Sequence, residues 1–189
     1  MLSLRSQSMM HAQNFSLIFW MGLLLSLCSA VFVYDVSVRR VPNRLLLAAL
    51  AAHAGGMLYT GHGIGGISAA DAMTGGLIGL ALFVPLYAFR AMGAGDVKFF
   101  AVLGVLLGPA ALIPVWLIAS LLAGMHAIVW YLQRRQVLTL LPRLGQVAQQ
   151  VTYSAFYQRL IERRNGRAGI PYAAYLALAA VMVSSWQHW

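Results

Sequence analysis

The sequence has little charge, and acidic residues are the scarcest. Only 9% of the 189 residues are charged, and four Asp or Glu stand against thirteen Lys or Arg. A water-soluble domain typically has about a quarter of its residues charged, so this chain cannot cover its own surface in water. The composition excludes an ordinary soluble enzyme and a disordered tail. It predicts a small polytopic membrane protein.

Cysteine is almost absent. Cys28 is the one cysteine, which excludes an internal disulfide and a zinc site built from cysteines. His53 and His126 lie in apolar stretches, but no spacing such as H-E-x-x-H joins them to an acidic residue. We therefore expect no metal and no other cofactor. Nucleic-acid binding is also excluded despite the net charge of +9, because the basic residues are few and stand between apolar runs.

Six apolar stretches predict the fold. A transmembrane helix needs about 20 mostly apolar residues. Residues 99–133 contain no charged side chain, but Gly108-Pro109 divides this stretch into two helices, because proline interrupts helical hydrogen bonding. We expect an all-α polytopic membrane protein with one integral domain over residues 1–189. Its six spans are predicted at residues 15–34, 45–60, 72–89, 95–108, 112–132 and 170–186.

The first apolar stretch could be mistaken for a signal peptide. It is longer than a typical signal core, and no small-x-small cleavage site clearly ends it. We interpret it as a permanent span. The start of translation at Met1, Met9 or Met10 is left open.

The basic residues predict the orientation. Three of the five loops between the spans, together with Lys98 at the adjoining start of the fourth span, carry every basic residue except Arg5, and the other two loops carry none. The positive-inside rule then puts these three loops in the cytoplasm and both termini outside. The third loop is the basic segment 133–168, in which residues near 144–163 have helical apolar spacing. It is either an interfacial amphipathic helix on anionic lipid or a plain loop that fixes the topology.

The four acidic residues fall into two groups. Asp71 precedes the third span, where it can cap a helix, and Glu162 lies among arginines. Asp35 and Asp96 instead stand at the cytoplasmic ends of the first and fourth spans, and hence at the same depth. An ionisable residue at membrane depth is costly and points to function. Two carboxylates that approach closely share a proton and can act as general base and general acid on a carbonyl.

Glycines precede Asp96 in the segment Gly93-Ala94-Gly95-Asp96. We expect Gly93 and Gly95 to permit a sharp backbone bend and a close approach of substrate, and Asp96 to be the N-cap of the next helix. The structural alternative is that Asp96 is only a helix cap and Asp35 only an interfacial anchor.

Three motifs in this order resemble the type IV prepilin peptidases, most closely the small branch that serves Flp (Tad-type) pili. The first is Asp35 followed by two arginines and Val41-Pro42-Asn43. The second is Gly-x-Gly-Asp-x-Lys, here from Gly93 to Lys98, and the third is Pro171-Tyr172 at the opening of the last span.

The resemblance implies a membrane aspartic endopeptidase of the bacterial inner membrane, with Asp35 and Asp96 as its catalytic acids. The substrate would be a prepilin, cut on the cytoplasmic side just before its hydrophobic helix, and pilus-assembly components are possible further partners. The other motif residues would bind substrate or support the site: Pro42, Asn43, Gly93, Gly95, Lys98, Pro171 and Tyr172.

Departures from the larger family members limit what the resemblance implies. Those members carry two Cys-x-x-Cys pairs for zinc in a cytoplasmic insertion and also N-methylate the new terminus. This chain has Cys28 alone and a first cytoplasmic loop of about ten residues. We expect peptidase activity without zinc and without methyl transfer. Arg39 and Arg40 are expected to meet anionic lipid in preference to an acidic residue of the pilin.

Two alternative functions are kept. A presenilin-type intramembrane protease is one, since Tyr34-Asp35 and Gly-Ala-Gly-Asp also resemble that group. The other is a small channel, carrier or assembly subunit in which the two carboxylates relay protons or anchor helices. Cleavage of a prepilin and the position of the cut distinguish the three.

Overall fold

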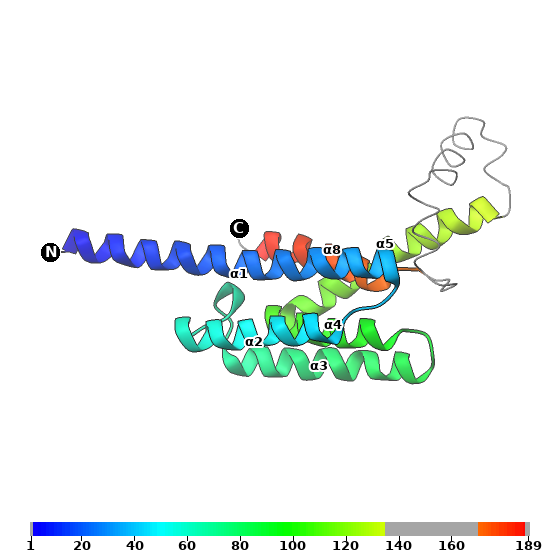
Figure 1. The fold of residues 1–189 in the computed structure, drawn as a ribbon, viewed down its shortest axis with the longest axis horizontal. Coiled ribbons are helices and arrows are strands. Elements are labelled where there is room, and N and C mark those ends of the chain that lie inside the picture. The colour runs from blue at the N-terminus through cyan, green and yellow to red at the C-terminus, as the bar shows by residue number, and fades with distance from the viewer. Residues whose placement is uncertain (1, 135–169, 188–189) are drawn as a thin grey trace, which may run out of the picture.

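The computed structural model describes residues 2–134 and 170–187 (Figure 1). In this part of the chain the regular elements are helices, so the predicted all-α fold is confirmed. They are α1 (Leu2–Val38), α2 (Asn43–Thr60), the 3₁₀ turn η1 (Ile64–Gly66), α3 (Ala69–Ala88), α4 (Ala94–Leu107), α5 (Pro109–Arg134) and α8 (Tyr172–Gln187).

Each predicted span overlaps one α-helix. The largest difference is in α1, which begins at Leu2 instead of residue 15 and continues to Val38. Among the described residues, three helices are long and apolar enough to cross a membrane: Ile18–Val38 within α1, all of α3, and Pro109–Leu132 within α5. The crossings by α2, α4 and α8 stay predictions. The predicted interfacial helix near 144–163, Glu162 and most of segment 133–168 lie outside the described residues.

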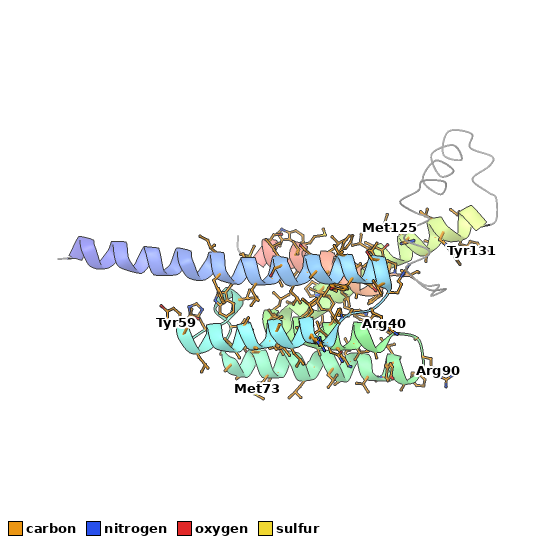
Figure 2. All side chains as sticks on the ribbon, viewed as in Figure 1. Arg40, Tyr59, Met73, Arg90, Met125 and Tyr131 are labelled. Atoms are coloured by element: carbon orange, nitrogen blue, oxygen red, sulfur yellow. The ribbon has the colours of Figure 1, made fainter. Side chains whose placement is uncertain are left out.

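Successive helices alternate in direction, so that α1 ends where α2, α4 and α8 begin (Figure 1). We call this the basic end of the bundle, defined by the connections 39–42 and 89–93 and by the first turn of α8. Figure 2 shows Arg40 and Arg90 at this end. The bundle therefore gathers at one end the described loops that the sequence predicts to be cytoplasmic.

Glycines allow α3 and α4 to pack with their backbones in contact. A Cβ atom on Gly75 would lie 2.1 Å from the Gly104 carbonyl oxygen, and one on Gly104 would lie 2.2 Å from that of Gly75. Beside them, the rings of Phe83 and Phe100 stack with centroids 3.9 Å apart. These small residues form a helix-packing face. This contact fixes the position of α4, whose first turn carries Asp96.

The start of α3 is capped by a reciprocal pair of hydrogen bonds. The Asp71 amide donates to Ser68 Oγ at 3.1 Å, and the Ser68 amide donates to Asp71 Oδ2 at 3.2 Å. This is a capping box. The capping role expected of Asp71 is confirmed, although Ser68 is the N-cap residue and Asp71 the third helical residue.

The substitution Gly75→Ala tests this packing. The added Cβ meets backbone that cannot rotate away, so we expect a loss of about 1–3 kcal/mol in the free energy of unfolding. Gly55→Ala is the matched control, because a Cβ there has no neighbour within 4 Å, and it should stabilise the helix by up to about 1 kcal/mol. Unfolding in mixed detergent micelles measures both. Equal stability of the two variants would contradict backbone contact between α3 and α4.

Candidate active site

A pocket of about 840 Å³ lies at the basic end of the bundle. Its wall comes from the last turn of α1, the connection to α2, and the first turns of α4 and α8. Eight of the residues expected at the site line it: Asp35, Pro42, Asn43, Gly93, Gly95, Asp96, Lys98 and Tyr172. The ninth, Pro171, is buried, and its carbonyl oxygen accepts the first hydrogen bond of α8 from the Tyr175 amide at 3.4 Å.

Asp35 lies in the last turn of α1, which continues one turn beyond the predicted span. Its side chain is only 6% exposed. The backbone N–H of Ala174, in the first turn of α8, donates to Asp35 Oδ2 at 3.0 Å. A buried carboxylate needs such partners, since unpaired burial of a charge is strongly unfavourable. The hydrogen bond joins α1 and α8 through two residues that are 139 positions apart in the chain.

Asp96 occupies the third position of α4, and not the N-cap position that the sequence analysis expects. The N-cap is Gly93, whose backbone N–H donates to Asp96 Oδ2 at 3.2 Å. The backbone N–H of Ala173 also donates to this carboxylate. The two carboxylates therefore accept hydrogen bonds from consecutive amides of α8, and they interact electrostatically with each other.

The glycines at the start of α4 act through space and not through a bend. Gly93 has φ −76° and ψ 148°, which any residue can adopt, and Gly95 also lacks a positive φ. Neither glycine therefore uses a backbone conformation that only glycine allows, and the expected close approach of substrate stays a prediction. A Cβ on Gly93 would lie 3.2 Å from Asp96 Oδ2, and one on Gly95 would lie 3.4 Å from Val41 Cγ2. Their small size lets the carboxylate and the α1–α2 connection come close to this turn.

Arg39 lines the pocket, and its expected contact with anionic lipid stays a prediction. It follows α1 with a left-handed φ of 56°, and its amide donates to the Asp35 carbonyl oxygen at 3.1 Å. Its side chain is half-buried, lines the pocket and attracts the Asp96 carboxylate. A left-handed conformation costs a non-glycine residue about 1 kcal/mol or more, and here it turns the chain from α1 toward α2. Arg40 also lines the pocket but is exposed.

Lys98 and Asn43 connect two of the motifs. Lys98 Nζ donates to Asn43 Oδ1 at 3.3 Å, which joins the first turn of α4 to the first residue of α2. Both side chains also line the pocket. They therefore hold the Asp96 turn against the segment that follows Asp35.

The pocket holds two carboxylates that interact electrostatically with each other. In the described residues no group of three or more His, Cys, Asp or Glu side chains could hold a metal ion. The sequence analysis missed the amides of Ala173 and Ala174, since a backbone donor has no residue-type signature. The Pro-Tyr motif just before them was the one available signal.

A double-mutant cycle tests the link between the motifs. Asn43→Ala and Lys98→Ala each remove the same hydrogen bond, so their effects on the free energy of unfolding should be non-additive by about 0.5–1 kcal/mol. Arg44→Ala is the control, because Arg44 is the exposed basic residue next to Asn43 and lies outside the pocket. Paired with Lys98→Ala, it should be additive. Additivity in both cycles would show that the hydrogen bond does not join the motifs.

Comparison with known families gives one match. The model of the type IV leader peptidase family matches residues 22–128, a range that contains Asp35 and Asp96 and ends before α8. Searches of curated proteins and of solved structures gave no match. The matched range covers more than half of the chain. The chain therefore belongs to the type IV leader peptidase family, and membership implies a membrane peptidase with a prepilin-like substrate.

Proposed function

We propose that this protein is an aspartic endopeptidase that removes the leader of an Flp-type prepilin on the cytoplasmic side of the inner membrane. Asp35 and Asp96 are its catalytic acids. The observation that carries the proposal is that two of the few acidic residues of the chain, from different helices, meet in one pocket and accept hydrogen bonds from adjacent amides. Those amides directly follow the third motif, Pro171-Tyr172.

The chemistry follows from one proton shared by two carboxylates. The ionised carboxylate takes a proton from a water molecule, and the oxygen of that water attacks the scissile carbonyl carbon. The protonated partner donates to the carbonyl oxygen, which gives a neutral tetrahedral intermediate. The carboxyl group that took the proton from water gives it to the amide nitrogen, the C–N bond breaks, and the other carboxylate takes a proton from a hydroxyl of the intermediate. The products are a carboxyl and an amine terminus, and the pair again holds one proton.

The position of the pocket fits a cut beside a hydrophobic helix. The pocket is formed by helix ends and lies at the basic end of the bundle. A prepilin whose hydrophobic helix packs along the bundle would present its polar leader at this level. The positive-inside rule supports a cytoplasmic location for the same end. The pocket suits the carbonyl and carboxylate groups of a peptide, because it is lined by the basic side chains of Arg39, Arg40 and Lys98.

The short α1–α2 connection argues against methyl transfer. Four residues, 39–42, separate the two helices, which is fewer than the ten-residue loop expected. Such a connection cannot hold the two cysteine pairs found in the bifunctional members. Cys28 is buried in α1. The proposed activity is therefore cleavage alone.

Conservative substitution of each acid tests the mechanism. Asp35→Asn and Asp96→Asn keep size and hydrogen-bonding ability but remove the shared proton, so each should reduce cleavage of a co-expressed Flp-type prepilin by at least about 10³-fold. Leader removal is measured by gel shift, with membrane accumulation of each variant checked.

Asp71→Asn is the matched control. Asp71 has the same helix position as Asp96, the third residue, and likewise accepts a hydrogen bond from its N-cap amide. It should retain cleavage within about twofold, because surface substitutions away from a site have small effects. Unimpaired cleavage by Asp35→Asn or by Asp96→Asn would exclude the aspartic mechanism. A cut inside the hydrophobic helix would favour the presenilin-type alternative. Absence of cleavage by the wild type would favour a channel, carrier or assembly subunit.

The rate should depend on pH on both sides of an optimum. At low pH the pair gains a second proton and loses its general base. At high pH it loses its only proton and with it the general acid. The profile of kcat/KM for a prepilin peptide in detergent micelles measures both limits. A flat profile across the range where carboxylates titrate would exclude a shared proton.

A further inference from the structure

The first turn of α8 is the third structural component of the pocket. The amide of Ala174 donates to Asp35, and that of Ala173 donates to Asp96. The first four amides of a helix have no acceptor inside the helix and lie at the positive end of its dipole. These two are therefore free to stabilise negative charge on either carboxylate. Their effect depends on where α8 begins, because a hydrogen bond weakens steeply with misalignment.

Tyr172 fixes where α8 begins. It is the first residue of α8, and its hydroxyl lies 2.9 Å from Ser120 Oγ of α5. The side chain of Trp116, one turn earlier on α5, also hydrogen-bonds to this hydroxyl. An indole N–H can only donate, so the tyrosine oxygen accepts from Trp116. Two side chains of a neighbouring helix thus hold one phenol oxygen.

The ring of Tyr172 is held as well. Its centroid lies 6.4 Å from that of Phe83 in α3, which itself stacks on Phe100 of α4. The same ring lines the pocket. Tyr172 is therefore in contact with α3 and α5, while the next two amides of its own helix reach the carboxylates.

We propose that Tyr172 is a positioning residue of the peptidase: held at its hydroxyl by Ser120 and Trp116, it sets the first turn of α8 so that one amide addresses each catalytic carboxylate. The proposal rests on the function proposed above, since it assigns a role within that site. In this arrangement α5 acts on the reaction through Tyr172, although none of its residues lines the pocket.

The substitutions Tyr172→Phe and Ser120→Ala remove the two sides of one hydrogen bond and leave the ring in place. Each should lower kcat for a prepilin peptide by about tenfold to a hundredfold, the effect of a small displacement at a reacting centre, with KM within about twofold. The double variant should lose no more activity than Tyr172→Phe alone, because that substitution already removes the bond to Ser120.

The pH profile distinguishes positioning from packing. Weaker donation by the two amides makes the anionic carboxylates less favourable, so both limits of the profile should move to higher pH in Tyr172→Phe. Ser184→Ala is the control. Ser184 is a buried hydroxyl at the far end of α8 whose Oγ donates to the Val181 carbonyl oxygen, and its profile should match the wild type.

A measurement without substrate separates this proposal from the peptidase assignment. Protonation of the pair is followed by the infrared band of the carboxylic acid, which is identified by its loss in Asp35→Asn. In Tyr172→Phe this band should persist to higher pH than in the wild type. That shift supports the positioning role even where the wild type cleaves no prepilin. An unchanged band and pH profile would overturn the role, whatever the rate. If Tyr172→Phe does not accumulate, Ser120→Ala gives the same test.

Discussion

The site depends on holding two carboxylates near each other in one pocket, with Asp35 buried and Asp96 half-buried. Mutual repulsion and burial both disfavour the charged forms. Compensation comes from the Ala173, Ala174 and Gly93 amides and from the charge of Arg39. All four of these groups lie at helix ends, where backbone amides or a turn can face a side chain. The pocket therefore has to lie where helices begin and end, and the bundle has to bring four such ends together.

The remaining motif residues are explained by that requirement. The Gly75–Gly104 contact sets α4 against α3, and the Lys98–Asn43 hydrogen bond sets the same helix against α2. Gly95 lets the α1–α2 connection approach the start of α4. None of these residues needs to touch a reacting atom. Under the proposed function, the motifs specify a relation between helices as much as a set of catalytic groups.

Much of this could be predicted from the sequence, because apolar runs and charge placement are local signals. They give six helices and the same level for Asp35 and Asp96. The resemblance to the prepilin peptidases gives the motif residues, most of which line the pocket. The role of α8 could not be predicted, since its donors are backbone amides and the partner of Tyr172 is 52 residues away. The N-cap residue of α4 also could not be predicted, because Gly and Asp are both acceptable at that position and the segment offers Gly93 and Asp96.

Asp71 and Asp96 show where local reasoning ends. Each is the third residue of an apolar helix and accepts a hydrogen bond from the N-cap amide. Asp71 lies at the opposite end of the bundle and has Ser68 as its partner, whereas Asp96 lies beside Asp35, Arg39 and the first turn of α8. The same local structure is a helix cap in one place and a candidate catalytic acid in the other. Tertiary packing makes the difference, and at Asp96 that packing is set by helices α3, α5 and α8.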